Sequence, residues 1–417
     1  MVTKHKSISV FEHEVLRIDK GEKLISIEQL DALRAFHGEK GTPYFSLIHN
    51  GVKFNEYVGV LQVGHLSIEI LPKADKNNDI HEWRRVLIEM LRMVGMTDVI
   101  ITGKSFLSLK TNKILDVYIE LFLIELERLM HKGLVKRYRK TESNLLALKG
   151  AVQFSRHVQQ NSIHKERFYV RYTTYDKEHE FNQVLYKTLL LIEQINTNPL
   201  LHSRIATAHL EFPELSHIVV NKAWFDRVRY TRKTESYQNA LTIARLLLLN
   251  FHPDIRTGRN YVLALLFDMN ALWERFVYVS LKKHLKDYTL IAQKVKPYWI
   301  ANGKRAVNIK PDIVINKGNK SYVIDTKWKV LDKVRPADSD LQQMYAYTKY
   351  FQTSHTLLIY PGLESGIYNA AFYDEESGTA RYPCSIMTIG LDVKNSIPNW
   401  QKHISNNVVQ FLEEGTK

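Results

Sequence analysis

The chain has 417 residues and a net charge of +14, with 45% hydrophobic and 24% charged residues; this composition is typical of globular proteins, and the length exceeds one ordinary core. There is no run of about 20 apolar residues and no apolar signal core, and a single cysteine, Cys384, excludes an internal disulfide or a multi-cysteine zinc site. We therefore expect a cytoplasmic protein of two or three domains whose basic charge favours a polyanionic partner, most commonly nucleic acid.

Residues 1–78 are expected to form an N-terminal β-rich domain. Leu66, Ile68 and Ile70 alternate with polar residues, which is the pattern of a strand with one buried face. Asn50-Gly51 and Gly64 predict tight hairpin turns.

Residues 79–255 are expected to form a mixed α/β middle domain that carries partner contacts. Apolar residues recur at helical spacing in three segments of this region, DIHEWRRVLIEMLRMVG (79–95), LDVYIELFLIELERLMHKG (115–133) and ALTIARLLLLNF (240–251). A glycine ends each of the first two patterns, as is common at helix C-termini. Proline, glycine and charged residues in Pro253–Asn260 predict the next domain boundary.

Two segments of the middle region interleave basic and aromatic residues, which suits a strand that follows a phosphate backbone. The candidate DNA contacts are Lys136, Arg137, Arg139 and Lys140 in the first segment and Arg227, Arg229, Arg232 and Lys233 in the second. The alternative is the solvated face of a basic domain, or a surface for an acidic partner.

Residues 256–417 are expected to form a C-terminal domain with elements in the order α-β-β-β-α-β. The segments are a helix at 263–285, strands within 289–300, a hairpin within 310–329, a helix at 339–351 and a strand at 355–361. This order predicts a mixed sheet flanked by helices. The fold class is therefore α/β, or mixed α+β.

The hairpin KPDIVINKGNKSYVIDTKWK (310–329) carries two carboxylates and a lysine in otherwise apolar runs. Asp325 and Lys327 share one face because residues two apart on a strand point the same way, and Asp312 can reach that face from the neighbouring strand. Adjacent buried carboxylates repel each other unless a cation lies between them. Mg²⁺, with Mn²⁺ as a substitute, takes such oxygen ligands and retains waters, one of which could attack a phosphodiester.

This pattern resembles the PD-(D/E)XK nuclease motif, carried by Asp312, Asp325 and Lys327. Glu274, in the preceding helix, matches the acidic residue that many of these nucleases place before the hairpin. Gln343 and Tyr347 match the Q-x-x-x-Y motif of several subfamilies. The alternative is that these residues have structural roles. Asp312 and Asp325 would be strand-end carboxylates with Lys327 as an ion-pair partner. Glu274 would be a surface glutamate, and Gln343 and Tyr347 would cap and pack.

The motifs LWERFV, KPDIVI, YVIDTKWK and DLQQMYAY, in this order, resemble the McrC family, the nuclease subunit of McrBC-type restriction systems. Upstream segments such as YVGVLQVGHLSIEILPK and HEFNQVLYKTLLLI also resemble this family, so that the likeness covers most of the chain. Gln342 departs from the pattern, which has an aromatic residue before the motif glutamine.

The resemblance implies a Mg²⁺-dependent DNA endonuclease that is recruited to modified DNA by an McrB-like AAA+ GTPase hexamer, whose hydrolysis it stimulates. We expect Asp312, Asp325, the Thr326 carbonyl and Glu274 to bind the metal, and Lys327 to activate the attacking water. No G-x-x-x-x-G-K-[ST] loop occurs in the sequence, so nucleotide hydrolysis must come from a partner. The alternatives are a stand-alone repair or recombination nuclease of the same fold, and a non-catalytic adaptor that activates a partner motor.

Overall fold

The computed structural model describes residues 6–64, 66–73, 79–95, 113–252, 262–300, 306–318, 320–331, 334–362, 364–374, 377–390 and 397–414. The chain divides into two compact units, one formed by residues 1–114 together with 253–417, and the other by residues 115–252. The mixed α/β class expected from the sequence is confirmed. The three-domain division at residues 78 and 255 stays a prediction, and Pro253–Asn260 lies outside the described residues. None of the described helices combines the length and apolar character that crossing a membrane requires.

The N-terminal part of the first unit is built on a sheet with neighbouring strands in the order β1-β6-β5-β11. Their bounds are Lys6–Phe11 (β1), Tyr57–Val63 (β5), Leu66–Leu71 (β6) and Val262–Asp268 (β11). β1 lies parallel to β6, whereas β5 is antiparallel to both β6 and β11. This sheet therefore brings a C-terminal strand into the N-terminal core.

The prediction of one helix over 263–285 was wrong for its first part, because Val262–Asp268 is strand β11. Its seven residues pair with β5, and Gly59 permits the close approach, since a Cβ on Gly59 would lie 2.1 Å from the Leu265 carbonyl oxygen. Pairing with β5 therefore outweighs the local helical pattern. The helix α9 (Met269–His284) begins only after Asp268, whose side chain accepts hydrogen bonds from the Asn270 and Ala271 amides.

A second small sheet covers this core, with strands in the order β2-β4-β3, beside the helix α1. The bounds are Val15–Arg17 (β2), Phe45–Ile48 (β3), Gly51–Phe54 (β4) and Ile27–His37 (α1). The hairpin near Asn50 is confirmed, but its turn residues are His49 and Asn50, because Ile48 pairs with Gly51. Gly51 lies inside the strand, where a Cβ would come within 2.1 Å of the Leu16 carbonyl oxygen.

The C-terminal part of the first unit contains the larger sheet, with strands in the order β12-β15-β16-β17-β20-β18 and β19 paired to β20. The bounds are Thr289–Ala292 (β12), Ile313–Lys317 (β15), Lys320–Thr326 (β16), His355–Gly362 (β17), Gly366–Tyr368 (β18), Ala371–Asp374 (β19) and Thr379–Gly390 (β20). The predicted hairpin is confirmed as antiparallel β15 and β16, and β17 continues the sheet in parallel with β16. The predicted element order is also confirmed, with β13 (Lys296–Trp299) and β14 (Val307–Ile309) as an added two-stranded ribbon.

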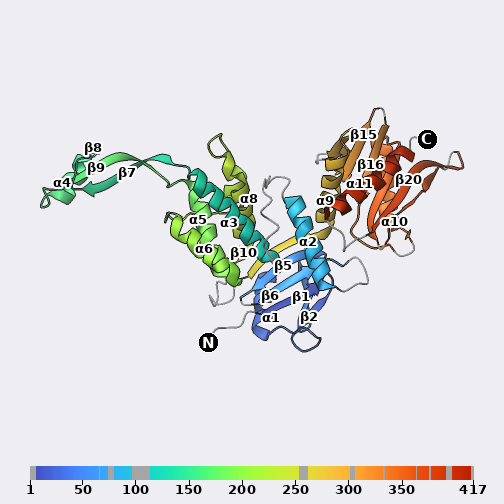
Figure 1. Ribbon diagram of the computed structural model, residues 1–417, viewed down its shortest axis with the longest axis horizontal. Coiled ribbons are helices and arrows are strands. Elements are labelled where there is room, and N and C mark those ends of the chain that lie inside the picture. Colours follow the sequence, from blue (N-terminus) through green and yellow to red (C-terminus); the bar gives the residue numbers. More distant parts are fainter. Residues whose placement is uncertain are drawn as a thin grey trace. The chain divides into compact units, whose positions relative to one another are not determined.

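Helices cover both faces of this sheet (Figure 1). On one face α10 (Asp338–Phe351) packs Met344 and Phe351 into a core with Val323. On the other face lie α9 and α11 (Ile397–Glu414), where Phe411 contacts the ring of Tyr322 at 6.3 Å. The helix α2 (Ile80–Gly95) packs on α9. Because adjacent strand residues face opposite ways, Asp325 lies on the α10 side with Val323.

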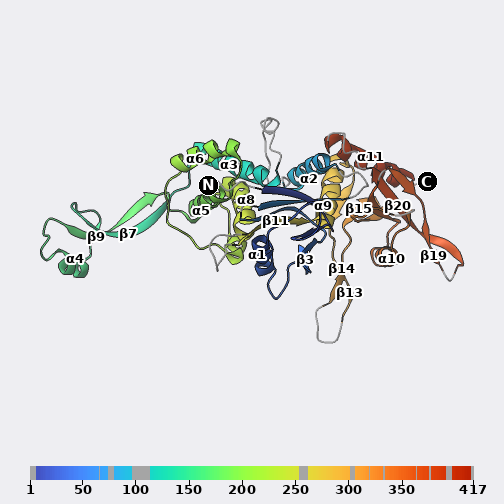
Figure 2. The ribbon, with the colours of Figure 1, turned by 90° about the horizontal axis from the view of Figure 1, so that it is seen from below.

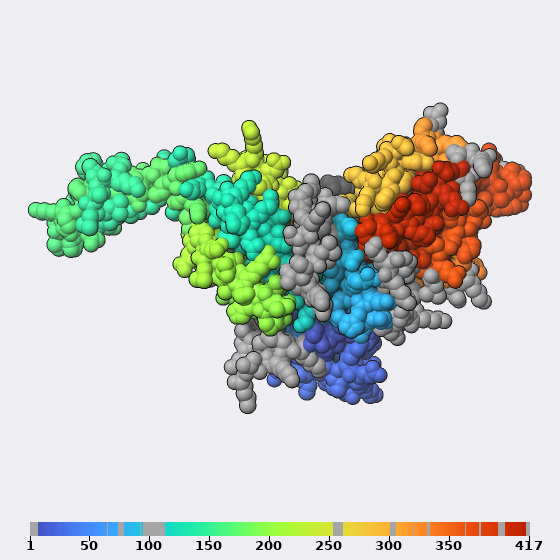
Figure 3. Space-filling view, viewed as in Figure 1, coloured from blue at the N-terminus to red at the C-terminus, as the bar shows by residue number. Residues whose placement is uncertain are grey.

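The second unit consists of helices and a long ribbon. The helices are Ile114–Lys132 (α3), Glu180–Ile195 (α5), Pro199–Glu211 (α6), Lys222–Arg227 (α7) and Gln238–Leu249 (α8), with the 3-10 turn Glu235–Tyr237 and the short strand Phe251–His252 (β10). The ribbon pairs Arg137–Leu145 (β7) with Phe168–Asp176 (β9), which also pairs with Ala151–Val152 (β8), and it carries Phe154–Asn161 (α4). Figure 1 shows it extending away from the helices of the same unit, with α4 at its far end, and the same projection is seen in the space-filling view of Figure 3. The helices predicted at 79–95, 115–133 and 240–251 are all confirmed.

Candidate active site

The register of the β15–β16 hairpin brings the two aspartates together. Its last ladder pair is Ile313 opposite Ile324, so that Asp312 and Asp325 follow side by side at the end of the hairpin. Asp312 Oδ2 accepts hydrogen bonds from the Thr326 amide at 2.7 Å and the Thr326 hydroxyl at 2.9 Å. These two bonds fix one carboxylate oxygen of Asp312 and leave the other for a ligand.

Asp325 is 1% exposed, and its charge is faced by Lys327. Lys327 Nζ lies 2.7 Å from Asp325 Oδ2. That oxygen nevertheless accepts no hydrogen bond of good geometry from any described residue. The Lys327 ammonium therefore compensates this buried oxygen mainly as an ion pair, and a carboxylate oxygen can accept from, or coordinate, more than one partner.

Burial and mutual repulsion make both aspartates weaker acids than usual. Burial, and then the charge of Glu274, raises the pKa of Asp312 to about 6, and burial, and then the charge of Asp312, raises the pKa of Asp325 to about 6. Burial tends to lower the pKa of Lys327, but the carboxylate of Asp325 outweighs it and the pKa is raised overall. Lys327 therefore stays protonated in this arrangement and compensates only part of the negative charge.

A chain of hydrogen bonds links Lys327 to helix α10. Lys327 Nζ donates to Gln343 Oε1 at 3.0 Å, Gln343 Nε2 donates to the Tyr347 hydroxyl at 2.7 Å, and that hydroxyl donates to the Lys310 carbonyl at 2.9 Å. Gln343 and Tyr347 lie four residues apart on one helix face. The structure thus brings the Q-x-x-x-Y pair to the lysine of the hairpin.

Glu274 reaches the same group from α9. Burial raises its pKa, and the charge of Asp325 adds to the effect. Gln293, which follows β12, donates from its side-chain amide to Glu274 Oε1 at 2.8 Å and from its backbone amide to the Asp312 carbonyl at 2.8 Å. Gln293 has a left-handed backbone, with φ of 49°, which is uncommon for a non-glycine residue. Gln293 was not among the predicted site residues, because neither a motif nor a hydrophobic pattern marks it in the sequence.

The donor set fits a hard cation such as Mg²⁺. No group of three or more His, Cys, Asp or Glu side chains in the described ranges is arranged to hold a metal. Mg²⁺, however, commonly takes one or two carboxylates and fills its remaining positions with waters and substrate phosphates. Asp325 Oδ2 lacks a directed donor, and Asp312 has one oxygen outside its bonds to Thr326. The ligand roles of Thr326 and Glu274 stay predictions.

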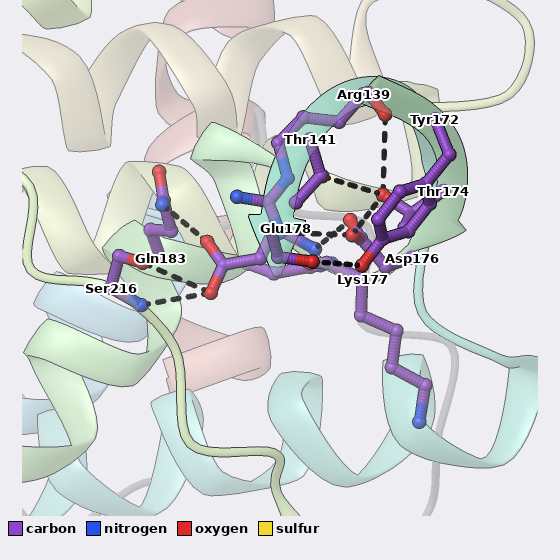
Figure 4. Close-up of polar contacts among 11 residues, drawn as sticks. Arg139, Thr141, Tyr172, Thr174, Asp176, Lys177, Glu178, Gln183 and Ser216 are labelled. Carbon is purple, nitrogen blue, oxygen red and sulfur yellow. Dashed lines mark hydrogen bonds and ion pairs between the residues drawn. The ribbon is translucent and has the colours of Figure 1, made fainter. Parts of the chain in front are cut away.

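The residues of the first basic segment lie on the ribbon or just before it. Lys136, Arg137, Arg139 and Lys140 are exposed. Arg139 is paired at 3.0 Å with Asp176, which also accepts a 2.8 Å hydrogen bond from Thr174 (Figure 4). Next to it, Glu178 accepts hydrogen bonds from Gln183 and from Ser216. The polar network therefore gives Arg139 a structural role at the base of the ribbon, and its DNA contact stays a prediction.

The second basic segment ends α7 and continues beyond it. Arg227, Arg229, Arg232 and Lys233 are all exposed, and the first two donate hydrogen bonds to nearby backbone carbonyls. The aromatic residues among them pack inward, since Trp224 and Tyr230 both contact the ring of Phe181. The aromatic residues of this segment therefore contribute to local packing, and the contact of the four basic residues with DNA stays a prediction.

Trp328, directly after Lys327, joins this site to the N-terminal sheet of the same unit. Its indole Nε1 donates to Glu12 Oε1 at 3.0 Å, and its backbone amide donates to Asn270 Oδ1 at 3.2 Å. Its ring packs edge-on against Trp273 and Trp83, with centroid distances of 5.4 and 6.4 Å. These supports were not predicted from the sequence, because the contacts join segments far apart in the chain.

Comparisons with known proteins place the chain among restriction-system proteins. A family model described as "McrBC 5-methylcytosine restriction system component" matches residues 52–361, and no curated protein matches the chain. A chain in the refined half-complex from a tetradecameric assembly of Thermococcus gammatolerans McrB AAA+ hexamers with bound McrC has a TM-score of 0.68 at 20% identity, over 97% of this chain and 100% of that one. A chain in the cryo-EM structure of the Thermococcus gammatolerans McrBC complex has a TM-score of 0.47 at 21% identity, over 68% of this chain and 89% of that one. At 20% identity, the first likeness shows a shared fold.

Proposed function

This chain belongs to the family of McrBC 5-methylcytosine restriction system components, and from that membership and its acidic site we propose that it is the DNA-cleaving subunit of such a system. The resemblance inferred from the motifs is thereby confirmed. The proposed reaction is Mg²⁺-dependent hydrolysis of DNA phosphodiesters, with Mn²⁺ as a substitute. The proposed substrate is DNA that carries modified bases.

The carboxylate of Asp325 is the observation that carries this proposal. Its Oδ2 is buried and lies 2.7 Å from Lys327 Nζ, and a second carboxylate, Asp312, is close enough to raise its pKa. A purely structural ion pair does not need a second buried acid beside it, because the repulsion costs stability. A hydrolytic metal site requires this clustering of charge.

The chain's own residues have separate roles in the proposed reaction. A bound Mg²⁺ would polarise the phosphate and lower the pKa of its water. Asp312 and Asp325 hold the cation, and Thr326 fixes Asp312 through two hydrogen bonds. Lys327 Nζ, directed by Gln343, positions the attacking water and stabilises negative charge on the phosphate.

We also propose that the cutting activity depends on a partner. The sequence has no phosphate-binding G-x-x-x-x-G-K-[ST] loop. The similar Thermococcus gammatolerans assembly consists of McrB AAA+ hexamers with bound McrC. The proposed partner is accordingly an McrB-like AAA+ GTPase hexamer, which selects modified DNA and whose hydrolysis this chain stimulates.

A plasmid-cleavage assay tests the proposed function. Methylated and unmethylated plasmids are incubated with the full chain and Mg²⁺, with and without the partner and GTP, and Asp325→Ala serves as the inactive variant. We expect cleavage of methylated plasmid only with partner and GTP, and none by the variant. Cleavage without the partner would instead indicate a stand-alone nuclease. No cleavage by the wild type, with partner stimulation intact, would indicate an adaptor.

A further inference from the structure

The β13–β14 ribbon is an element of the first unit that no motif in the sequence explains. The two strands pair with each other in a separate two-stranded sheet, inserted between β12 and the aspartate-bearing β15. Figure 2 shows the ribbon projecting from the larger sheet. A projecting ribbon exposes apolar side chains to solvent, and exposed apolar surface of this kind commonly marks a binding site.

Both ends of the ribbon are bonded to residues of the acidic site. At its start, Gln293 donates hydrogen bonds to Glu274 and to the Asp312 carbonyl, both at 2.8 Å. At its end, the Lys310 carbonyl accepts a 2.9 Å hydrogen bond from the Tyr347 hydroxyl. The base of the ribbon is therefore held next to the position where the scissile phosphate must lie.

The ribbon is also braced against the last turn of α10. Lys296 Nζ donates to the Tyr350 carbonyl at 2.9 Å and lies 4.8 Å from the centroid of the Phe351 ring. The rings of Tyr298 and Tyr350 meet edge-on at 5.9 Å. Because α10 also carries Gln343 and Tyr347, the ribbon and the catalytic lysine share one rigid support.

The far part of the described ribbon is apolar and exposed. Trp299 is 58% exposed and Ile300 is 68% exposed. The Trp299 indole makes no hydrogen bond or ring contact within the part of the chain that the structure describes. Aromatic side chains that project in this way bind nucleobases by stacking or by insertion between base steps.

The charge of the ribbon indicates what it binds. The sequence from Gln293 to Pro311 contains no aspartate or glutamate. Lys294, near its base, forms no ion pair with any described residue, and the charge of Lys310 faces Glu274, where it opposes the rise in the pKa of that carboxyl. Cations beside a phosphodiesterase site attract the phosphates that flank the scissile bond. An acidic protein surface would satisfy the charge, but it would not explain the bonds to the site at both ends.

We propose that the β13–β14 ribbon is a DNA-binding element that enters a groove of the duplex beside the cleavage position. Lys294 and Lys310 contact flanking phosphates, and Trp299 contacts the bases. The dimensions fit, because the major groove of B-form DNA admits a two-stranded β-ribbon. This proposal rests on the proposed nuclease function, since it deepens the description of the same site.

Fluorescence anisotropy with a labelled duplex tests the proposal. The full chain is titrated in Ca²⁺ so that binding is measured without cleavage, and the titration is repeated over a range of salt concentrations. Trp299→Ala should weaken binding by about 5- to 100-fold with an unchanged salt slope. Lys294→Ala should weaken it and reduce the slope by roughly 1. Tyr373→Ala, which removes a 68% exposed aromatic residue on β19, is the matched control and should bind like wild type.

The outcomes separate this proposal from the proposed function. Weaker DNA binding by Trp299→Ala supports the ribbon proposal whether or not the wild type cleaves DNA. Absence of cleavage by the wild type with partner and GTP would overturn the proposed nuclease function, but not the ribbon proposal. Wild-type DNA affinity in both ribbon variants would overturn the ribbon proposal, even if cleavage is normal. Loss of partner stimulation in Trp299→Ala with unchanged DNA affinity would assign the ribbon to the partner and also overturn it.

Discussion

Trp328 Nε1 donates a 3.0 Å hydrogen bond to Glu12 Oε1, across 316 positions of the sequence. Trp328 follows the site lysine directly, and Glu12 follows strand β1 of the N-terminal sheet. Glu12 also accepts a 2.7 Å hydrogen bond from the Lys73 amide. The N-terminal sheet and the acidic site are therefore mechanically connected within one unit.

Loss of this carboxylate should reduce both stability and cleavage. Glu12→Ala leaves the buried indole and the Lys73 amide without their acceptor, at a cost of about 1–3 kcal/mol, and loosens the residue next to Lys327. Urea unfolding and the plasmid assay measure the two effects. Glu12→Gln, which keeps an acceptor oxygen, should restore most of both. If Glu12→Ala cleaves and unfolds like wild type, the hydrogen bond between Glu12 and Trp328 contributes to neither stability nor cleavage.

The pKa of Glu12 gives this pair a pH dependence. Burial raises the pKa of Glu12, against the opposing effect of hydrogen bonds from Lys73 and Trp328. When the pKa of a carboxyl is higher in the folded state than in the unfolded state, the group stabilises the fold at pH values below the unfolded-state pKa. This stabilisation is lost as the pH rises through the folded-state pKa. The melting temperature of Glu12→Gln relative to wild type should thus increase from pH 4 to pH 7. A constant or falling difference would contradict this assignment.

Asp312→Asn should stabilise the metal-free protein while abolishing cleavage. The amide oxygen can still accept both hydrogen bonds from Thr326, whereas the charge that burial and Glu274 disfavour is removed. Because the pKa of Asp312 is about 6, wild type loses stability between about pH 4 and pH 6. Asp312→Asn has no ionisable group at this position, so it does not lose stability for this reason over the same pH range.

The gain for Asp312→Asn should approach roughly 3 kcal/mol well above pH 6 and vanish near pH 4. Thermal melts in a chelator measure it. Asp31→Asn, at a carboxyl with 60% side-chain exposure on α1, serves as the control and should change little. Added Mg²⁺ should stabilise wild type and leave Asp312→Asn unchanged. A destabilised Asp312→Asn at pH 7 would show that the carboxylate is a structural partner.

Tyr347→Phe should slow cleavage through Gln343. The hydroxyl joins Gln343 Nε2 to the Lys310 carbonyl, and its removal frees the amide that directs Lys327. One lost hydrogen bond of about 1 kcal/mol corresponds to roughly a fivefold lower rate. Single-turnover cleavage measures this loss, and thermal melts check that folding is retained. An unchanged rate would limit Gln343 and Tyr347 to packing.

Gln293→Gly separates backbone strain from positioning of Glu274. Glycine suits the left-handed backbone at φ of 49°, but the hydrogen bond to Glu274 is lost. Stability should stay equal or rise, while cleavage falls about fivefold. Gln352→Gly, at a second left-handed glutamine with φ of 51°, should be stabilised without any loss of cleavage. Equal cleavage in the two variants would remove Gln293 from the site.

The sequence was sufficient to predict the hairpin and the residues that meet at its end. Alternation in the β15–β16 runs, together with two-residue spacing of Asp325 and Lys327, follows from strand geometry alone. The register that brings Asp312 beside Asp325 follows from a short turn at Gly318. Gln343 and Tyr347 were found through their resemblance to the Q-x-x-x-Y motif, and their four-residue spacing places both on one face of α10.

Contacts between distant segments were not predictable from local pattern. The run Val262–Asp268 has the composition of a buried helix as well as that of a strand, and only pairing with β5 decides between them. Gln293 acts through a backbone conformation that no motif marks. Glu12 and Trp328 are in contact although 316 positions separate them in the sequence, and the pairing of Arg139 with Asp176 follows from the β7–β9 register.

Metal binding tests the central claim, that Asp312 and Asp325 form a cation site for phosphodiester hydrolysis. Mn²⁺ is titrated into the full chain and followed by the loss of its free electron paramagnetic resonance signal, for wild type, Asp325→Asn and the exposed control Asp31→Asn. We expect saturable binding by wild type and the control, with affinity rising as the pH passes about 6, and none by Asp325→Asn. Equal binding by all three proteins would contradict the claim, because the aspartate pair would then hold no metal.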